Sequence, residues 1–139
     1  MSGRIQDLEK LGSFLKKNRI KNIKLPVSAP FHCSLMSKAT DVMREELGKL
    51  NFKKGKNSLV SNITANEIFN ANELKDLLVK QIENRVRWRE SVINMIEKGV
   101  NQFIEIGPGK VLSGLVKRIN KDVEVISINN EDDIKSIKI

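Results

Sequence analysis

Residues 103–112, Phe-Ile-Glu-Ile-Gly-Pro-Gly-Lys-Val-Leu, decide the fold of this chain. The first four residues have the apolar, β-branched and aromatic character of a short strand. The Gly-Pro-Gly run marks a turn, and apolar residues recur at helical spacing from Val111 onward. A strand that leads through a tight turn into a helix is the repeating unit of α/β proteins.

The rest of the chain alternates between helix and strand in the same way. Segments 59–63 and 123–128 have the character of strands. Apolar residues three and four apart predict helices over residues 2–17, 35–50, 70–82, 88–98 and 111–119. In the helix at 35–50, the apolar stripe from Leu35 to Leu50 is expected to be buried. The fold class is therefore α/β, with parallel neighbouring strands.

Several residues indicate where helices begin and end. Asn70 and Glu73 have the spacing of a capping box at a helix start. A break is expected near Asn84, and Gly99 is placed to end the helix that begins near Trp88.

The composition indicates a cytoplasmic globular domain. The 139 residues are 40% hydrophobic and 30% charged, and no apolar run approaches the roughly 20 residues of a membrane span. The first residues lack the apolar core of a secretory signal. One cysteine suits a reducing compartment, and one histidine beside one cysteine makes a metal site improbable.

The net charge of +8 raises the alternative of a nucleic-acid-binding module. However, the basic residues are scattered among acidic ones, as on ordinary solvated surfaces. Aromatic residues make up only 4%, so platforms for stacking bases are scarce. We therefore expect neither nucleic acid nor a membrane as a partner.

The turn Gly107-Pro108-Gly109-Lys110 lies where phosphate-binding loops occur. A Walker loop requires Ser or Thr after the lysine, and the dinucleotide pattern requires a third glycine where Leu112 stands. Neither requirement is met, so a tight turn that starts a helix is favoured over phosphate binding.

His32 is the only histidine, and it lies in a loop flanked by Pro26 and Pro30. A loop histidine is a better candidate for catalysis than a histidine on an apolar stripe, although a plain surface role remains open. A nucleophile pair with Cys33 is not favoured, because neighbours in an extended segment point to opposite sides. Cys33 is expected to be a packing residue.

Four segments, taken together, resemble one known family. They are 25–36 (LPVSAPFHCSLM), 78–88 (LVKQIENRVRW), 105–112 (EIGPGKVL) and Asn129. In order and spacing they resemble malonyl-CoA:acyl carrier protein transacylases, over about residues 5–130. The resemblance implies that residues 1–25 end a small ferredoxin-like insert with its last helix. Residues 26–139 would form the C-terminal part of a large α/β-hydrolase-like acyltransferase subdomain.

The resemblance implies ping-pong acyl transfer in fatty acid biosynthesis. A serine takes malonyl from coenzyme A and passes it to the phosphopantetheine thiol of acyl carrier protein, with no further cofactor and no metal. His32 matches the general base. Gln81 matches the residue whose main-chain carbonyl orients that histidine, although its place on an apolar stripe leaves a structural role open. Phe31 matches a position that selects malonyl by crowding a methyl group on the acyl chain, and one methyl group contributes only about 1–3 kcal/mol of discrimination. The alternative is that Phe31 simply packs the loop.

The chain departs from the family in two ways. It contains no Gly-x-Ser-x-Gly motif and hence no nucleophile, and Arg85 stands where the family usually has proline. We therefore expect the chain alone to be inactive, as a truncated piece, a broken gene product or half of a split enzyme with a separate N-terminal half. The alternative is a non-catalytic remnant that binds acyl carrier protein, although no defined basic patch is evident from the sequence. An exposed apolar sheet face is expected to cause dimerisation or aggregation.

Overall fold

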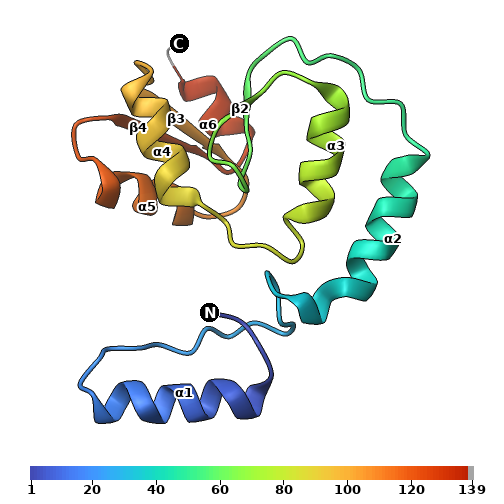
Figure 1. The fold of residues 1–139 in the computed structure, drawn as a ribbon. Helices are drawn as coiled ribbons and strands as arrows, with labels where there is room; N and C mark the ends of the chain where they lie inside the picture. The colour runs from blue at the N-terminus through green and yellow to red at the C-terminus, as the bar shows by residue number, and fades with distance from the viewer. Residues whose placement is uncertain (138–139) are drawn as a thin grey trace. The chain divides into compact units, whose positions relative to one another are not determined.

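The computed structural model describes residues 1–137, which form two compact units, residues 1–87 and the residues from 88 onward (Figure 1). The boundary predicted after residue 25 separates an insert from a subdomain of the related family, not two compact units of this chain, and it stays a prediction. Each unit has its own elements and is described separately.

The first unit is mainly helical. Its elements are α1 (Ile5–Lys17), the 3-10 helix η1 (Ser34–Met36), α2 (Ser37–Gly48), β1 (Leu59–Val60), β2 (Glu67–Ile68) and α3 (Ala71–Lys80). The two short strands pair antiparallel, with Leu59 opposite Ile68. The predicted strand at 59–63 is therefore only two residues long, and its partner β2 was not predicted.

Helix α1 ends in a Schellman motif. Ile20 donates its N–H to Leu15 O at 2.9 Å, and Arg19 donates its N–H to Lys16 O at 3.1 Å. This geometry requires a left-handed residue directly after the cap, and Arg19 takes it with φ of 57°. Glycine is the usual residue there because it has no Cβ to clash.

The prediction of a buried stripe along 35–50 is wrong. Most of these apolar side chains are exposed, with Val42 at 61% and Leu50 at 54%, while Thr40 is the residue of α2 that is buried. Periodic spacing identified the helix correctly but could not show whether another element covers its apolar face.

Helix α3 begins as predicted. The Asn70 side chain accepts hydrogen bonds from the N–H groups of Asn72 and Glu73, so the predicted cap is confirmed. Leu77 and Val79 are buried in this helix. Lys75 joins α3 to the turn after α2 through a 2.9 Å hydrogen bond to Leu50 O.

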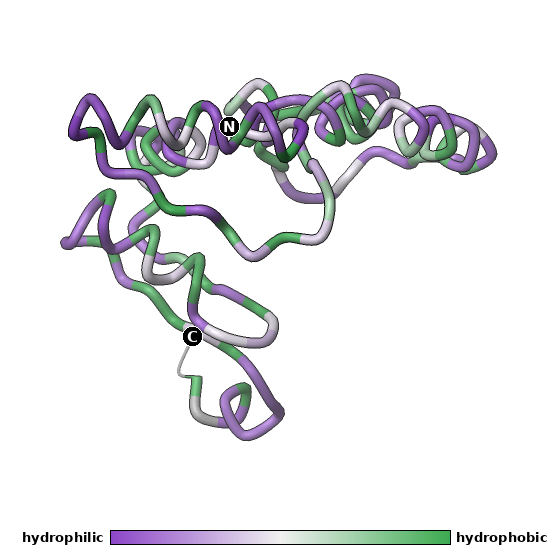
Figure 2. The backbone as a smooth tube through the Cα atoms, turned by 90° about the horizontal axis from the view of Figure 1, so that it is seen from below, coloured by the Kyte–Doolittle hydropathy of each residue, from purple (hydrophilic) through white to green (hydrophobic). Residues whose placement is uncertain are grey.

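The second unit is an α/β layer. Its elements are α4 (Trp88–Glu97), β3 (Gln102–Ile106), α5 (Val111–Ile119), β4 (Glu124–Ile128) and α6 (Glu131–Ser136). Strands β3 and β4 pair in parallel, as predicted for α/β organisation. Figure 2 shows hydrophobic and hydrophilic residues alternating along the helices, as amphipathic helices require.

The core of this unit lies on one face of the two strands. Val92 of α4, Val116 of α5 and Val123 are buried together, and Phe103 and Val125 of the strands pack against them. Gly99 ends α4 with φ of 93°, which confirms the predicted cap.

The opposite face of the two strands is apolar as well. Ile104 pairs with Ile126 and Ile106 with Ile128, and paired residues of a parallel sheet share a face. Ile104 is 40% exposed and Ile106 is 79% exposed. Parallel sheets are normally covered on both faces, so this second face is unusual in remaining accessible.

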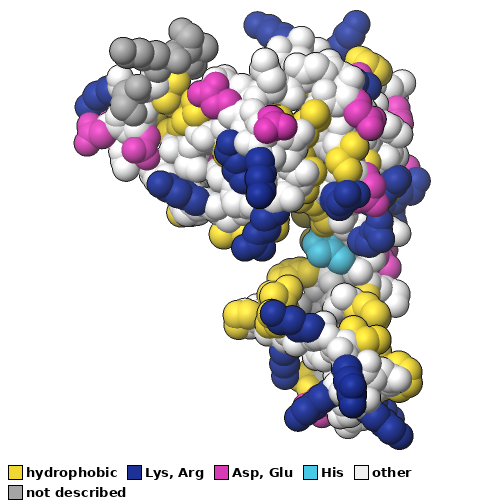
Figure 3. All heavy atoms as spheres, turned by 90° about the vertical axis from the view of Figure 1, so that its left-hand side faces the viewer, with side chains coloured by type: hydrophobic (Ala, Val, Ile, Leu, Met, Phe, Trp, Pro, Cys, Tyr) yellow, Lys and Arg dark blue, Asp and Glu magenta, His cyan; other side chains and the backbone are white. Residues whose placement is uncertain are grey.

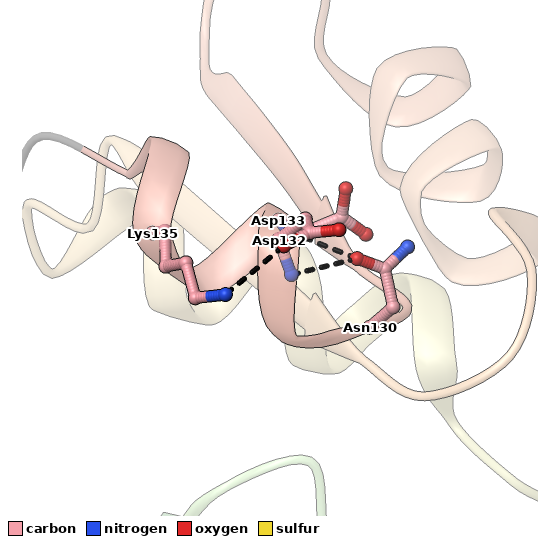
Figure 4. A network of polar contacts seen from close by, with 4 residues as sticks. All are labelled: Asn130, Asp132, Asp133 and Lys135. Atoms are coloured by element: carbon pink, nitrogen blue, oxygen red, sulfur yellow. Dashed lines mark hydrogen bonds and ion pairs between the residues drawn. The ribbon is translucent and has the colours of Figure 1, made fainter.

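Helix α6 was not predicted, although its start carries a clear signal. The Asn130 side chain accepts hydrogen bonds from the N–H groups of Asp132 and Asp133, and Lys135 pairs with Asp132 at 3.1 Å (Figure 4). Acidic residues in the first turn of a helix are favoured by its dipole. Within residues 1–137, no helix combines the length and apolar character needed to cross a membrane.

Candidate functional site

His32 is held in an unusual backbone conformation at the surface of the first unit. Its φ is 62°, in the left-handed region, and its side chain is exposed. The imidazole, the one cyan side chain in Figure 3, is visible at the surface. Histidine enters this region more readily than most residues, but such strain persists only where surrounding contacts impose it.

Three main-chain carbonyls impose the conformation. The His32 N–H donates to Ile82 O at 3.1 Å, while Nδ1 lies 2.9 Å from Gln81 O and 3.0 Å from Asn84 O. Carbonyl oxygens only accept hydrogen bonds, so Nδ1 must carry the hydrogen. In the neutral ring, Nε2 then has a free lone pair and can take a proton.

The carbonyls belong to the turn that follows α3, which ends at Lys80. The N–H groups of Gln81 and Ile82 donate back to Leu77 O and Val79 O, which ties this turn to the helix. Asn84 completes the turn, donating its N–H to Lys80 O at 3.2 Å and its side-chain amide to the same oxygen at 2.8 Å.

The structure therefore brings His32 and Gln81, both predicted from the sequence, within hydrogen-bond distance. Asn84 and Ile82 were missed as partners of His32. They act through main-chain oxygens, which every residue type possesses, so their identity carries no signal of this role.

The neighbours of His32 have local contacts. Phe31 is 46% exposed and donates its N–H to Ala29 O at 2.9 Å. The half-buried Cys33 thiol lies 3.1 Å from Pro30 O, which favours the packing role expected for it. Within residues 1–137, no cluster of His, Cys, Asp or Glu side chains could hold a metal ion.

The turn at Gly107–Lys110 in the second unit leads into α5, whose first N–H groups are not free to bind a phosphate. Glu105 accepts hydrogen bonds from Leu112 N–H at 3.1 Å and Ser113 N–H at 2.7 Å, so its carboxylate already occupies the start of α5. Asn129 Oδ1 accepts the Gly109 N–H at 2.6 Å. These contacts favour the tight-turn interpretation of the sequence.

The Glu105 carboxylate is stabilised in its charged form. Hydrogen bonds from the Ser113 side chain and N–H, with a further one from Leu112 N–H, lower the pKa of Glu105 below its ordinary value. The Ser113 hydroxyl also lies 2.7 Å from the Ser127 hydroxyl of β4, which links the helix start to both strands.

Comparison with known proteins gives a consistent match. The chain is 37% identical over 136 residues to the malonyl CoA-acyl carrier protein transacylase of Bacillus subtilis, covering 97% of this chain and 43% of that protein. The Escherichia coli K12 protein of the same name is 37% identical over 130 residues, covering 93% of this chain and 42% of that protein. No protein-family model matches the chain.

Solved structures agree with these relatives. The malonyl CoA-acyl carrier protein transacylase of Clostridium perfringens superposes with a TM-score of 0.85 at 40% identity, over 92% of this chain and 40% of that one. A complex of a type II PKS acyl-carrier protein with its malonyl-transacylase superposes with a TM-score of 0.88 at 34% identity, over 96% of this chain and 44% of that one.

The relatives and the solved structures that match this α/β chain are acyltransferases. The chain belongs to the malonyl CoA-acyl carrier protein transacylase family, and its extent is consistent with a C-terminal portion of such a protein. It spans about two fifths of the length of the curated relatives that it matches.

Proposed function

We propose that this chain supplies the general-base part of an active site for malonyl transfer from coenzyme A to acyl carrier protein in fatty acid biosynthesis. The observation that carries the proposal is the fixed tautomer of His32, with Nδ1 bonded to Gln81 O and Asn84 O. The 139 residues contain no Gly-x-Ser-x-Gly motif, so the proposal assigns the serine nucleophile to a polypeptide segment outside them.

Nε2 of His32 would take the proton of the serine hydroxyl as the serine oxygen attacks the malonyl thioester. The carbon–sulfur bond breaks, and the proton passes from Nε2 to the departing coenzyme A sulfur, leaving a malonyl-serine ester and a free thiol. In the second half, Nε2 takes the proton of the phosphopantetheine thiol, whose sulfur attacks the ester. The serine oxygen leaves and regains a proton from Nε2.

The residue roles proposed here follow from position. Gln81 holds His32 through its main-chain carbonyl, and Phe31, adjacent to His32 and half exposed, crowds a methyl-bearing acyl group. Besides the malonyl-CoA thioester and the phosphopantetheine thiol, which are the substrates, no cofactor is proposed. We also propose that residues 1–25 belong to a ferredoxin-like insert and residues 26–139 to an α/β-hydrolase-like subdomain, in a cytoplasmic protein.

A complementation assay tests the catalytic proposal. The purified chain is assayed for malonyl transfer alone, and then mixed with a polypeptide comprising the part of the Bacillus subtilis relative that this chain does not match. We expect no transfer by the chain alone and turnover by the mixture. His32→Ala in the mixture should abolish turnover, whereas Cys33→Ser, which keeps a donor for Pro30 O, should retain it.

Two outcomes would contradict this proposal. Turnover by the chain alone that disappears in His32→Ala would mean that a nucleophile lies within the 139 residues. A folded, associated pair without turnover would argue against a shared active site.

A second function, binding of acyl carrier protein without catalysis, is favoured by one feature of the structure. Lys16, Arg19 and Lys21 line a hollow of about 390 Å³ at the end of α1. Among the described residues, none of these three cations forms an ion pair. Unpaired cations in a concave surface suit an acidic protein partner, and carrier proteins are usually acidic.

Charge reversal tests whether this hollow is the docking surface for acyl carrier protein. Arg19→Glu with Lys21→Glu should weaken carrier binding about two- to fivefold at low salt, because an exposed ion pair contributes up to about 1 kcal/mol. The matched control is Lys54→Glu with Lys56→Glu in the turn before β1. Equal effects of the two pairs, or binding unchanged by added salt, would show that the hollow is not the docking surface.

A further inference from the structure

The carbonyls that hold His32 all belong to one short segment, residues 81–84. A main-chain carbonyl cannot be removed by substituting a side chain. The orientation of the imidazole therefore depends on whatever fixes this segment in place.

The loop at residues 61–66 contacts both ends of the segment that follows α3. At the near end, Asn62 donates its side-chain amide to Gln81 Oε1 at 3.2 Å. At the far end, Arg87 donates its N–H to Asn62 O at 2.8 Å and its guanidinium to Thr64 O at 3.0 Å. Asn62 thus bridges the start and the end of residues 81–87.

The loop is itself a fixed structure. Ser61 is buried, donates its N–H to Asn66 O at 3.0 Å, and accepts the Ile63 N–H on its hydroxyl at 3.1 Å. Ala65 is 4% exposed and left-handed, with φ of 59°. A buried alanine in that conformation persists only where its surroundings determine it, so the loop can act as a rigid support.

We propose that Asn62 is a positioning residue for the reaction, acting through Gln81 on the tautomer and orientation of His32. Residues that support a metal-bound histidine typically change activity by about 10- to 100-fold when they are replaced, and we expect an effect of similar size here. This inference rests on the proposed role of His32 as the base, but its first test does not require activity.

Because His32 is the only histidine, its ring nitrogens can be observed directly by ¹⁵N NMR of the chain. At about pH 8.5, where an ordinary imidazole is neutral, we expect the wild-type ring to have hydrogen on Nδ1 and none on Nε2. Asn62→Ala should lose this preference, so that the two nitrogen shifts move toward each other. Asn62→Asp should restore it, because the Gln81 amide can turn to donate to the new carboxylate.

The controls separate positioning from folding. Gln81→Met removes the partner of Asn62 but keeps the main-chain carbonyl, so it should produce the same shift, and the double variant should add nothing further. Asn51→Ala, at an exposed asparagine elsewhere in the unit, should leave the shifts unchanged. The amide spectrum of each variant reports whether the chain is folded.

A folded Asn62→Ala chain with an unchanged Nδ1–H preference would overturn the proposal, as would a folded Gln81→Met chain that keeps the preference. In the complemented enzyme, the expected effect of Asn62→Ala is about a tenfold lower kcat at unchanged KM. If complementation fails but the tautomer shifts as expected, the role of His32 in malonyl transfer fails while the support by Asn62 stands.

Discussion

At the residue scale, both the backbone and the imidazole ring of His32 are fixed, the ring by hydrogen bonds to main-chain carbonyls and the backbone by a left-handed conformation. The left-handed φ of 62° restricts which residues can replace it. Asn enters this region readily, whereas a β-branched residue there is a genuine outlier. Catalysis and backbone strain can therefore be separated by the choice of substitution.

We expect His32→Asn to keep the fold and lose the chemistry. In the complemented enzyme, activity should fall about 10²- to 10⁴-fold, because a general base is removed. The free energy of unfolding, measured in urea, should change little. His32→Val should lose the same activity and be less stable than His32→Asn by about 1–2 kcal/mol, because its Cβ substituents clash in the left-handed region. Equal stability of the two variants would contradict this account of the loop.

The sequence identified His32 as the candidate base but did not reveal all the residues that hold it. His32 and Gln81 stand in motif positions, so the resemblance located both. The carbonyl of Asn84 and the amide of Asn62 were missed, because each acts through geometry that depends on how α3 ends and how the 61–66 loop folds. A main-chain partner leaves no mark on residue type.

At the element scale, helices were easier to predict than strands. The apolar spacing of α3, α4 and α5, the start of α3 at Asn70 and the end of α4 at Gly99 are local properties, so the sequence of each segment predicts them. The two-residue strands β1 and β2 form only because they pair with each other, which a single segment does not reveal. Helix α6 could have been found, since Asn130 followed by three acidic residues is a helix-start pattern.

The left-handed Arg19 at the end of α1 predicts that one substitution will stabilise the helix end and weaken carrier binding. Arg19→Gly should relieve the backbone and slow amide exchange at Ile20 about two- to fivefold, equivalent to roughly 0.5–1 kcal/mol. The same change removes a cation from the hollow and should weaken carrier binding. Asn18→Gly is the control, because Asn18 is not left-handed and glycine relieves no strain there. The Ile20 amide should therefore exchange faster in this variant than in the wild type. Slower exchange in Asn18→Gly would show that the effect is not tied to the left-handed position.

The Glu105 cap makes the second unit sensitive to acid. Its folded-state pKa is lowered, so its stabilising contribution is present above the ordinary carboxyl pKa of 4.5 and is lost as pH falls through the folded value. We expect urea unfolding, followed by fluorescence of the only tryptophan, Trp88, to show falling stability below about pH 4.5. Glu105→Gln should be less stable at pH 7 and lose less on acidification, with Glu97→Gln as the control for one charge. Parallel pH curves for wild type and Glu105→Gln would contradict the assignment.

At the scale of the whole molecule, apolar surface is abundant. Ile104 and Ile106 lie exposed on a parallel two-stranded sheet, a size of sheet that is only marginally stable by itself. Exposed apolar faces of this kind promote association. The composition gave no warning of this, because 40% hydrophobic residues is ordinary for a chain that buries them.

We expect the chain to dimerise or aggregate at micromolar concentration. Ile104→Lys with Ile106→Lys should shift the population toward monomer in light scattering, because charges on the sheet face oppose stacking of two copies. Val42→Lys replaces a residue that is also exposed, on α2, and should have little effect. A wild-type chain that stays monomeric would show that the core is self-sufficient despite the open face.

Three main-chain oxygens within residues 81–84 hold His32, which has a consequence for the changes that this segment can accept. The bond from position 82 to His32 does not depend on residue type, because any amino acid supplies a carbonyl, whereas Asn84 also donates its side-chain amide to Lys80 O. The number of residues from Gln81 to Asn84 is not free, since one insertion or deletion would rotate the oxygens away from the ring. We therefore expect an insertion between Gln81 and Asn84 to disturb the site more than a substitution at position 82.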